Sequence, residues 1–139
     1  MKHFLSESTI WQTTSEFITP NGQISYGMGE TAITVLHDKI INNSWAQLGN
    51  IKRENNYIIR QISDNRYVSE SSNPELGIQT GVYDIDKNTV FFKFKIEGTS
   101  MNGFEIIRRE GDNCHAQGAL YDDNSLINTW TAMLVARHK

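Results

Sequence analysis

The chain has 139 residues, of which 38% are hydrophobic and 21% are charged, and its formal net charge is −3. This length suits one domain, so we expect residues 1–139 to form a single domain with 1–8 as a short N-terminal extension. That extension is expected either to make one helical turn or to fray. The acidic balance and the lack of a Lys/Arg-rich run argue against a nucleic-acid partner.

The single cysteine and the character of the N-terminus indicate a cellular compartment. Cys114 has no second cysteine to pair with, so an intrachain disulfide is excluded, and this fits a reducing environment. The N-terminus lacks the apolar core of a signal peptide. No stretch approaches the roughly 20 apolar residues of a membrane span. We therefore expect a soluble cytoplasmic protein.

Short β-type runs follow one another along the chain, and turn-forming residues separate them. Such turns close hairpins between sequential antiparallel strands. Period-two alternation supports the assignment, for example in the run that contains Val90, Phe92, Phe94 and Ile96 on one face. The pattern predicts ten strands, at residues 9–19, 23–36, 39–48, 52–62, 66–72, 77–85, 89–97, 101–109, 114–121 and 125–135.

Ten sequential strands without a long crossover predict an all-β fold, an antiparallel up-and-down meander of about ten strands. A sheet of this length tends to close into a barrel, because closure removes its exposed edges. A closed barrel has room for side chains and a small ligand. A β-sandwich competes, but it usually needs a longer connection. Bulges or sharp bends are expected at glycines inside the strands, namely Gly27, Gly29, Gly81, Gly103 and Gly118.

Two segments connect this pattern with a known superfamily. Trp11 lies in the first predicted strand, and residues 126–130 (Leu-Ile-Asn-Thr-Trp) lie in the last. In this architecture the chain resembles the calycin superfamily of lipocalin, fatty-acid-binding and avidin-like barrels, and the resemblance covers nearly the whole chain. Thr9 stands where lipocalins usually have a glycine, and the connections are too short for a helical lid. The resemblance implies a calycin-like barrel that carries or senses a small molecule, although some calycin barrels are enzymes.

Histidine and cysteine spacing predicts no metal site. His3, His37, His115 and His138 form no His-x-x-x-His pair, and Cys114 is adjacent to His115, so the two face opposite sides of a strand. The cofactor is unknown from sequence. A haem held by His115 or His37 is an alternative, since one axial ligand is enough.

Three carboxylates, Glu30, Glu70 and Glu105, lie within predicted strands and not in turns. A glutamate that faces the lumen is costly to bury unless it is paired. Arg60 and Arg108 are the mid-strand cations that could pair with it, and such a pair would hold a carboxylate or hydroxyl of a ligand. The alternative is a solvent-facing charge. Alternation does not decide between them, because bulges shift the parity of a strand.

The abundance of aromatic residues favours a binding role, because ligand pockets are mainly apolar with a few polar groups. We therefore predict that the barrel lumen binds a small apolar or amphipathic molecule. The expected ligand-binding residues are Arg60, Glu70, Tyr83, Glu105, Trp45 and Trp130.

Two alternatives stay open. One is a small enzyme (an isomerase, lyase or hydrolase) that uses a lumenal glutamate with a raised pKa as general acid or base. The other is a protein-interaction module, for example a homodimer, that uses outer aromatic residues such as Phe91. The polar connector at residues 71–77 is expected at the barrel mouth, where loops often carry specificity.

Overall fold

The computed structural model describes residues 1–73 and 77–137, and within these ranges it contains ten strands and no helix. Each strand begins and ends within one residue of its prediction. Part of the connector predicted at the mouth, residues 74–76, lies outside the described residues. The strands are β1 (Thr9–Ile18), β2 (Ile24–Val35), β3 (Ile40–Leu48), β4 (Ile51–Ser63), β5 (Arg66–Asn73), β6 (Gly77–Asp86), β7 (Thr89–Ile96), β8 (Met101–Glu110), β9 (Asn113–Asp122) and β10 (Ser125–Ala136).

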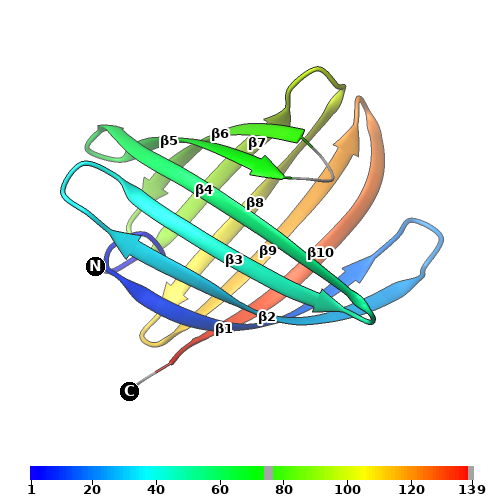
Figure 1. The fold of residues 1–139 in the computed structure, drawn as a ribbon, viewed down its shortest axis with the longest axis horizontal. Coiled ribbons are helices and arrows are strands. Elements are labelled where there is room, and N and C mark those ends of the chain that lie inside the picture. Colours follow the sequence, from blue (N-terminus) through cyan, green and yellow to red (C-terminus); the bar gives the residue numbers. More distant parts are fainter. Residues whose placement is uncertain (74–76, 138–139) are drawn as a thin grey trace.

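Every strand pairs antiparallel with its neighbour in sequence, and β10 pairs with β1, which closes the barrel (Figure 1). In the closing ladder Trp11 lies opposite Ala136, and Phe17 lies opposite Trp130. The predicted all-β, up-and-down antiparallel meander closed into a barrel is confirmed. Across residues 1–73 and 77–137 no helix is present that could cross a membrane.

Bulges were predicted at the glycines inside the strands, but the register of the strand pairs shifts at other positions. The register shifts between Gln61 and Ser63 in the β4–β5 ladder and between Leu126 and Asn128 in the β9–β10 ladder. It runs unbroken through Gly27, Gly29, Gly81, Gly103 and Gly118. Several of these glycines make room for rings instead: a side chain at Gly81 would collide with the ring of Phe92.

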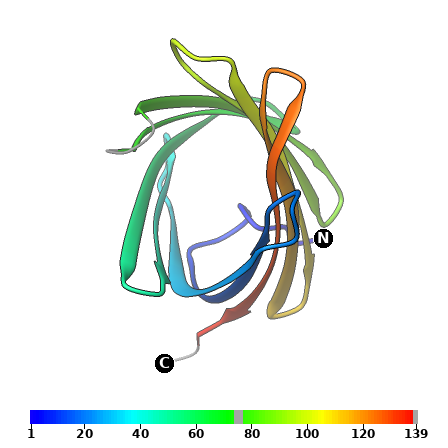
Figure 2. The same ribbon diagram turned by 90° about the vertical axis from the view of Figure 1, so that its right-hand side faces the viewer.

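The N-terminal extension is ordered and closes one end of the barrel. Phe4 and Leu5 are only 4% and 2% exposed and belong to the hydrophobic core with Trp11. The backbone N–H of Ser6 donates to the carbonyl of His3 at 3.1 Å, which forms a turn. The segment is therefore neither helical nor frayed. In Figure 2 it crosses the far end of the ring of strands.

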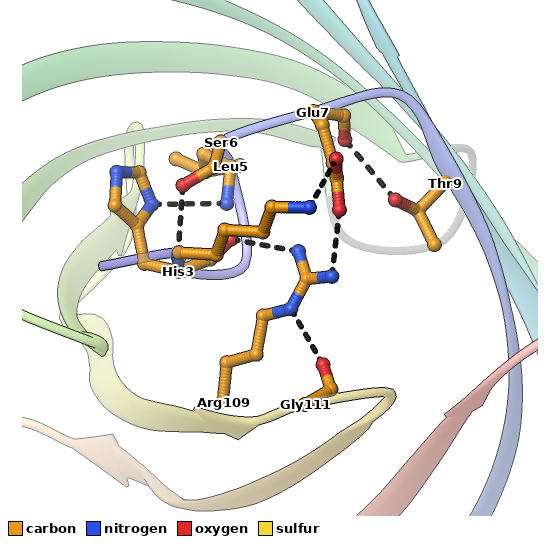
Figure 3. A network of polar contacts seen from close by, with 8 residues as sticks. His3, Leu5, Ser6, Glu7, Thr9, Arg109 and Gly111 are labelled. Atoms are coloured by element: carbon orange, nitrogen blue, oxygen red, sulfur yellow. Dashed lines mark hydrogen bonds and ion pairs between the residues drawn. The ribbon is translucent and has the colours of Figure 1, made fainter.

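Arg109 ties this N-terminal segment to the barrel (Figure 3). Its guanidinium donates to Oε1 of Glu7 at 2.7 Å, to the carbonyl of His3 at 3.3 Å and to the carbonyl of Gly111 at 2.9 Å. The guanidinium carbon also lies 5.1 Å from the ring centroid of Trp11, within cation–π range. These contacts hold the segment over the end where the β8–β9 hairpin turns.

Candidate functional site: a cavity in the barrel lumen

A cavity of about 320 Å³ lies in the lumen. It begins beside Phe4 at the end that the N-terminal segment closes. It reaches Phe17, Leu48 and Arg53, which lie near the hairpins at the opposite end. Its volume is near the lower end of the roughly 300–1,000 Å³ that ligand pockets span.

Eleven of the lining residues form three groups, and they occupy inward-facing positions, since alternate residues of a strand face the same side. The first group, on β1, β2 and β3, is uncharged and polar: Thr13, Ser15, Thr31, Asn42 and Ser44. The second group, on β4, β6 and β7, is aromatic: Tyr57, Tyr83, Phe92 and Phe94. The third group, on β8 and β10, combines an acid with an indole: Glu105 and Trp130.

The aromatic group forms one connected wall. The rings of Tyr83 and Phe92 stack with centroids 4.2 Å apart at 12°, and Phe92 stacks on Phe94 at 5.4 Å. Tyr57 meets Phe92 edge-on at 6.3 Å. Burial raises the pKa of both tyrosines, so their hydroxyls stay neutral. The wall gives an apolar ligand a broad aromatic surface with two hydroxyl groups, those of the two tyrosines.

The polar group is uncharged, and three of its residues are hydrogen-bonded to one another. Ser44 Oγ lies 3.2 Å from Thr31 Oγ1 and 2.5 Å from Asn42 Oδ1. Hydroxyls both donate and accept, so this side of the cavity does not discriminate by charge.

Glu105 is the acid of the lumen, and Trp130 is its partner. The indole Nε1–H donates to Glu105 Oε2 at 2.7 Å. Burial raises the pKa of Glu105, and the indole hydrogen bond opposes that rise. Trp130 engages Oε2 and leaves Oε1 without a hydrogen bond from the described residues. One carboxyl oxygen is therefore held by the protein, and the other is available to a molecule in the cavity.

Three of the six predicted ligand-binding residues, Tyr83, Glu105 and Trp130, border the cavity together. Trp45 also borders it, but the residue is 39% exposed and its side chain lies on the outer face, where the Lys52 ammonium lies 5.1 Å from the ring centroid.

Arg60 and Glu70 lie elsewhere. Both are exposed on the outer face of the barrel, because their neighbours Ile59 and Ser69 are buried on the inner face. The structure therefore does not bring Arg60 or Glu70 to the cavity. Phe91, the outer aromatic considered for protein contacts, is exposed on β7.

Sequence reasoning missed the uncharged polar residues of the site. Asn42 and Gln79 line the cavity and are buried, yet neither belongs to a motif. Burial raises the pKa of Tyr57, and the neighbouring Gln79 amide opposes that rise. The alternation of strand faces could have indicated Asn42. Tyr57 and Ile59 share a face of β4, and the residues paired with them on β3 are Asn42 and Ile40.

The cysteine and the histidines lie apart from this chemistry. Burial raises the pKa of Cys114 to about 12, which keeps the thiol protonated and unreactive at neutral pH. His37 and His115 are exposed, and His138 lies outside the described residues. Within residues 1–73 and 77–137, no three His, Cys, Asp or Glu side chains gather as metal ligands would.

Comparison with known proteins supports the fold. No protein-family model and no curated protein sequence matches the chain. Similar solved structures include the S-type phycobiliprotein lyase CPES from Guillardia theta, with a TM-score of 0.71 and 8% identity over 95% of this chain and 89% of that one. Rv2717c from M. tuberculosis has a TM-score of 0.71 and 9% identity over 94% and 92%. These likenesses support the closed antiparallel barrel fold.

Proposed function

We propose that this protein binds a small, mostly apolar molecule in the barrel lumen, with Glu105 contacting the polar end of that molecule. The observation that carries the proposal is the cavity of about 320 Å³, with its aromatic wall and the available Oε1 of Glu105. Burial of apolar ligand surface against Tyr83 and its neighbours would supply affinity at about 25 cal/mol per Å². The proposed contacts are Tyr83, Glu105 and Trp130; Arg60, Glu70 and Trp45 are left out because their side chains lie on the outer face.

A cavity-filling variant tests the proposal. Ala132 lines the cavity, whereas Thr131 beside it is exposed on the outer face. We expect N-phenyl-1-naphthylamine to show a saturable, one-to-one fluorescence increase with the wild type and with Thr131→Phe, and none with Ala132→Phe. Native mass spectrometry of the purified protein should likewise show any retained molecule in the first two proteins only. A wild type that neither retains a mass nor binds the probe would overturn the proposal.

A lyase-type enzyme is the second candidate, favoured by one observation. Glu105 is a partly buried carboxyl with a raised pKa beside a cavity, as a general acid or base requires. One of the similar barrels is named a phycobiliprotein lyase.

Mass analysis of the bound molecule separates the two candidates. A carrier returns the molecule unchanged after incubation with the wild type. An enzyme converts it with the wild type and fails to convert it with Glu105→Gln.

A further inference from the structure

Charge is distributed unevenly over the cavity lining. The described lining residues include one carboxyl group, that of Glu105, and one guanidinium group, that of Arg53. Arg53 is exposed near the β3–β4 hairpin at the mouth, where water and salt screen its charge. Glu105 lies deeper, in the middle of β8, beside Trp130.

No cation among the described residues compensates Glu105. Its hydrogen-bond partner is a neutral indole, and its pKa is set by burial and that single bond. A buried carboxylate without a cation is unfavourable. A ligand that brings a positive charge or an N–H donor to Oε1 would relieve this cost, since charge-assisted hydrogen bonds are the stronger ones.

We propose that the ligand of this lumen is a planar aromatic molecule carrying an amine or a comparable N–H donor, and that a carboxylate-bearing molecule of the same shape is disfavoured. This inference rests on the proposed lumen binding and names its ligand class. The amine donates to Oε1 of Glu105 while its ring packs against the wall around Phe92 and Tyr83. A ligand carboxylate at the same place would oppose Glu105 as a like charge inside a low-dielectric barrel.

The uncharged polar wall does not reverse this preference. The hydroxyls of Ser44 and Thr31 can donate or accept, so they serve an amine and a carboxylate about equally. The preference for an amine over a carboxylate therefore depends on Glu105.

A matched series of fluorescent probes tests the ligand class directly. The probes share one ring system: 9-(aminomethyl)anthracene is cationic, 9-anthracenemethanol is neutral and 9-anthracenecarboxylic acid is anionic at neutral pH. We expect the amine to bind the wild type at least about tenfold more tightly than the acid, with the alcohol between them, as one hydrogen bond to a charged group would give.

The variants assign the preference to Glu105. In Glu105→Gln we expect the amine and acid affinities to come within about threefold of each other, while the alcohol changes little. Glu70→Gln, which removes an exposed charge of the same sign, should keep the wild-type order and so controls for attraction to an acidic surface. Ala132→Phe should weaken all three probes.

The outcomes distinguish a failure of lumen binding from a failure of the proposed ligand class. Binding of no probe would overturn the proposed lumen function and this inference together. Binding of the acid as tightly as the amine, or an amine preference that survives Glu105→Gln, would overturn the ligand class and leave lumen binding standing.

Discussion

The indole of Trp130 on β10 donates a 2.7 Å hydrogen bond to Glu105 on β8, although β9 runs between these two strands. Gly118 is the β9 residue that lies opposite both of them in the two ladders. A Cβ atom at Gly118 would lie 2.5 Å from Cζ2 of Trp130. The missing side chain therefore lets the indole cross β9 and reach the carboxyl group.

Replacing Gly118 with valine tests this relationship. The added side chain would collide with the Trp130 ring and with the backbone carbonyl of Phe104, and the carbonyl belongs to the sheet, so it cannot retreat without distorting the strand. We expect a loss of about 1–3 kcal/mol in the free energy of unfolding, as for other overpacked sites, measured by urea denaturation. Gln117→Val, at the exposed neighbouring position, should change it by less than about 0.5 kcal/mol. Equal stabilities of the two variants would contradict the assignment.

The pH dependence of stability tests the burial of Glu105. Because its pKa in the folded protein is raised above the usual value of 4.5, the folded state prefers the protonated carboxyl. Its contribution to stability is complete below pH 4.5 and is lost as the pH rises through the raised pKa. Gln keeps an acceptor for the indole but never ionises, so Glu105→Gln should match the wild type near pH 4 and exceed it in melting temperature at pH 8.

The matched control for this experiment is Glu70→Gln. Glu70 is exposed on β5, so its neutralisation should leave the pH profile of the melting temperature close to that of the wild type. A difference between Glu105→Gln and the wild type that is constant from pH 4 to pH 8 would argue against a buried, shifted carboxyl.

The strands could be predicted from sequence because turn residues and period-two alternation are local signals. The lumenal face could not be predicted, because polarity is inverted in two strands that matter. On β8 the outward residues Phe104 and Ile106 are apolar, while Glu105 between them faces the cavity. On β5, between residues 66 and 72, the buried residues are Ser69 and Ser71. Ordinary alternation would have assigned the opposite faces.

The position of the N-terminal segment at the end of the barrel could not be predicted from local sequence either. Residues 1–8 have no strand pattern, and they contact Arg109, about a hundred positions along the chain. The aromatic and acidic character of the lumen could be anticipated from Tyr83, Glu105 and Trp130. Choosing Glu105 over Glu70 needed the register across the two bulged ladders.

The reactivity of Cys114 gives a further test of packing. The residue is fully buried, and its thiol pKa is raised to about 12, so both access and ionisation are suppressed. We expect a thiol reagent such as dithionitrobenzoate to react with the native protein at pH 8 much more slowly than with protein unfolded in guanidinium. Similar rates in the two states would show that the core around β9 opens readily.

Arg109→Lys tests how the closed end is held. Lysine keeps the charge but loses the planar fork that reaches Glu7, His3 and Gly111 together. We expect a loss of about 2 kcal/mol in the free energy of unfolding and faster amide hydrogen exchange in residues 1–8.

The neighbouring Arg108→Lys is the control, because Arg108 forms an exposed ion pair with Glu110 at 3.3 Å, and such pairs contribute little.

The contribution of Glu7 to stability also has a defined pH window. Its pKa is lowered chiefly by the hydrogen bond from Arg109, so its stabilisation is present above the usual pKa of 4.5 and is lost as the pH falls through the lowered value.

If Arg109→Lys speeds exchange in residues 1–8 but leaves binding of the anthracene probes intact, the N-terminal segment closes the barrel without forming part of the ligand contacts. If probe binding falls with it, the packed end around Phe4 also shapes the cavity.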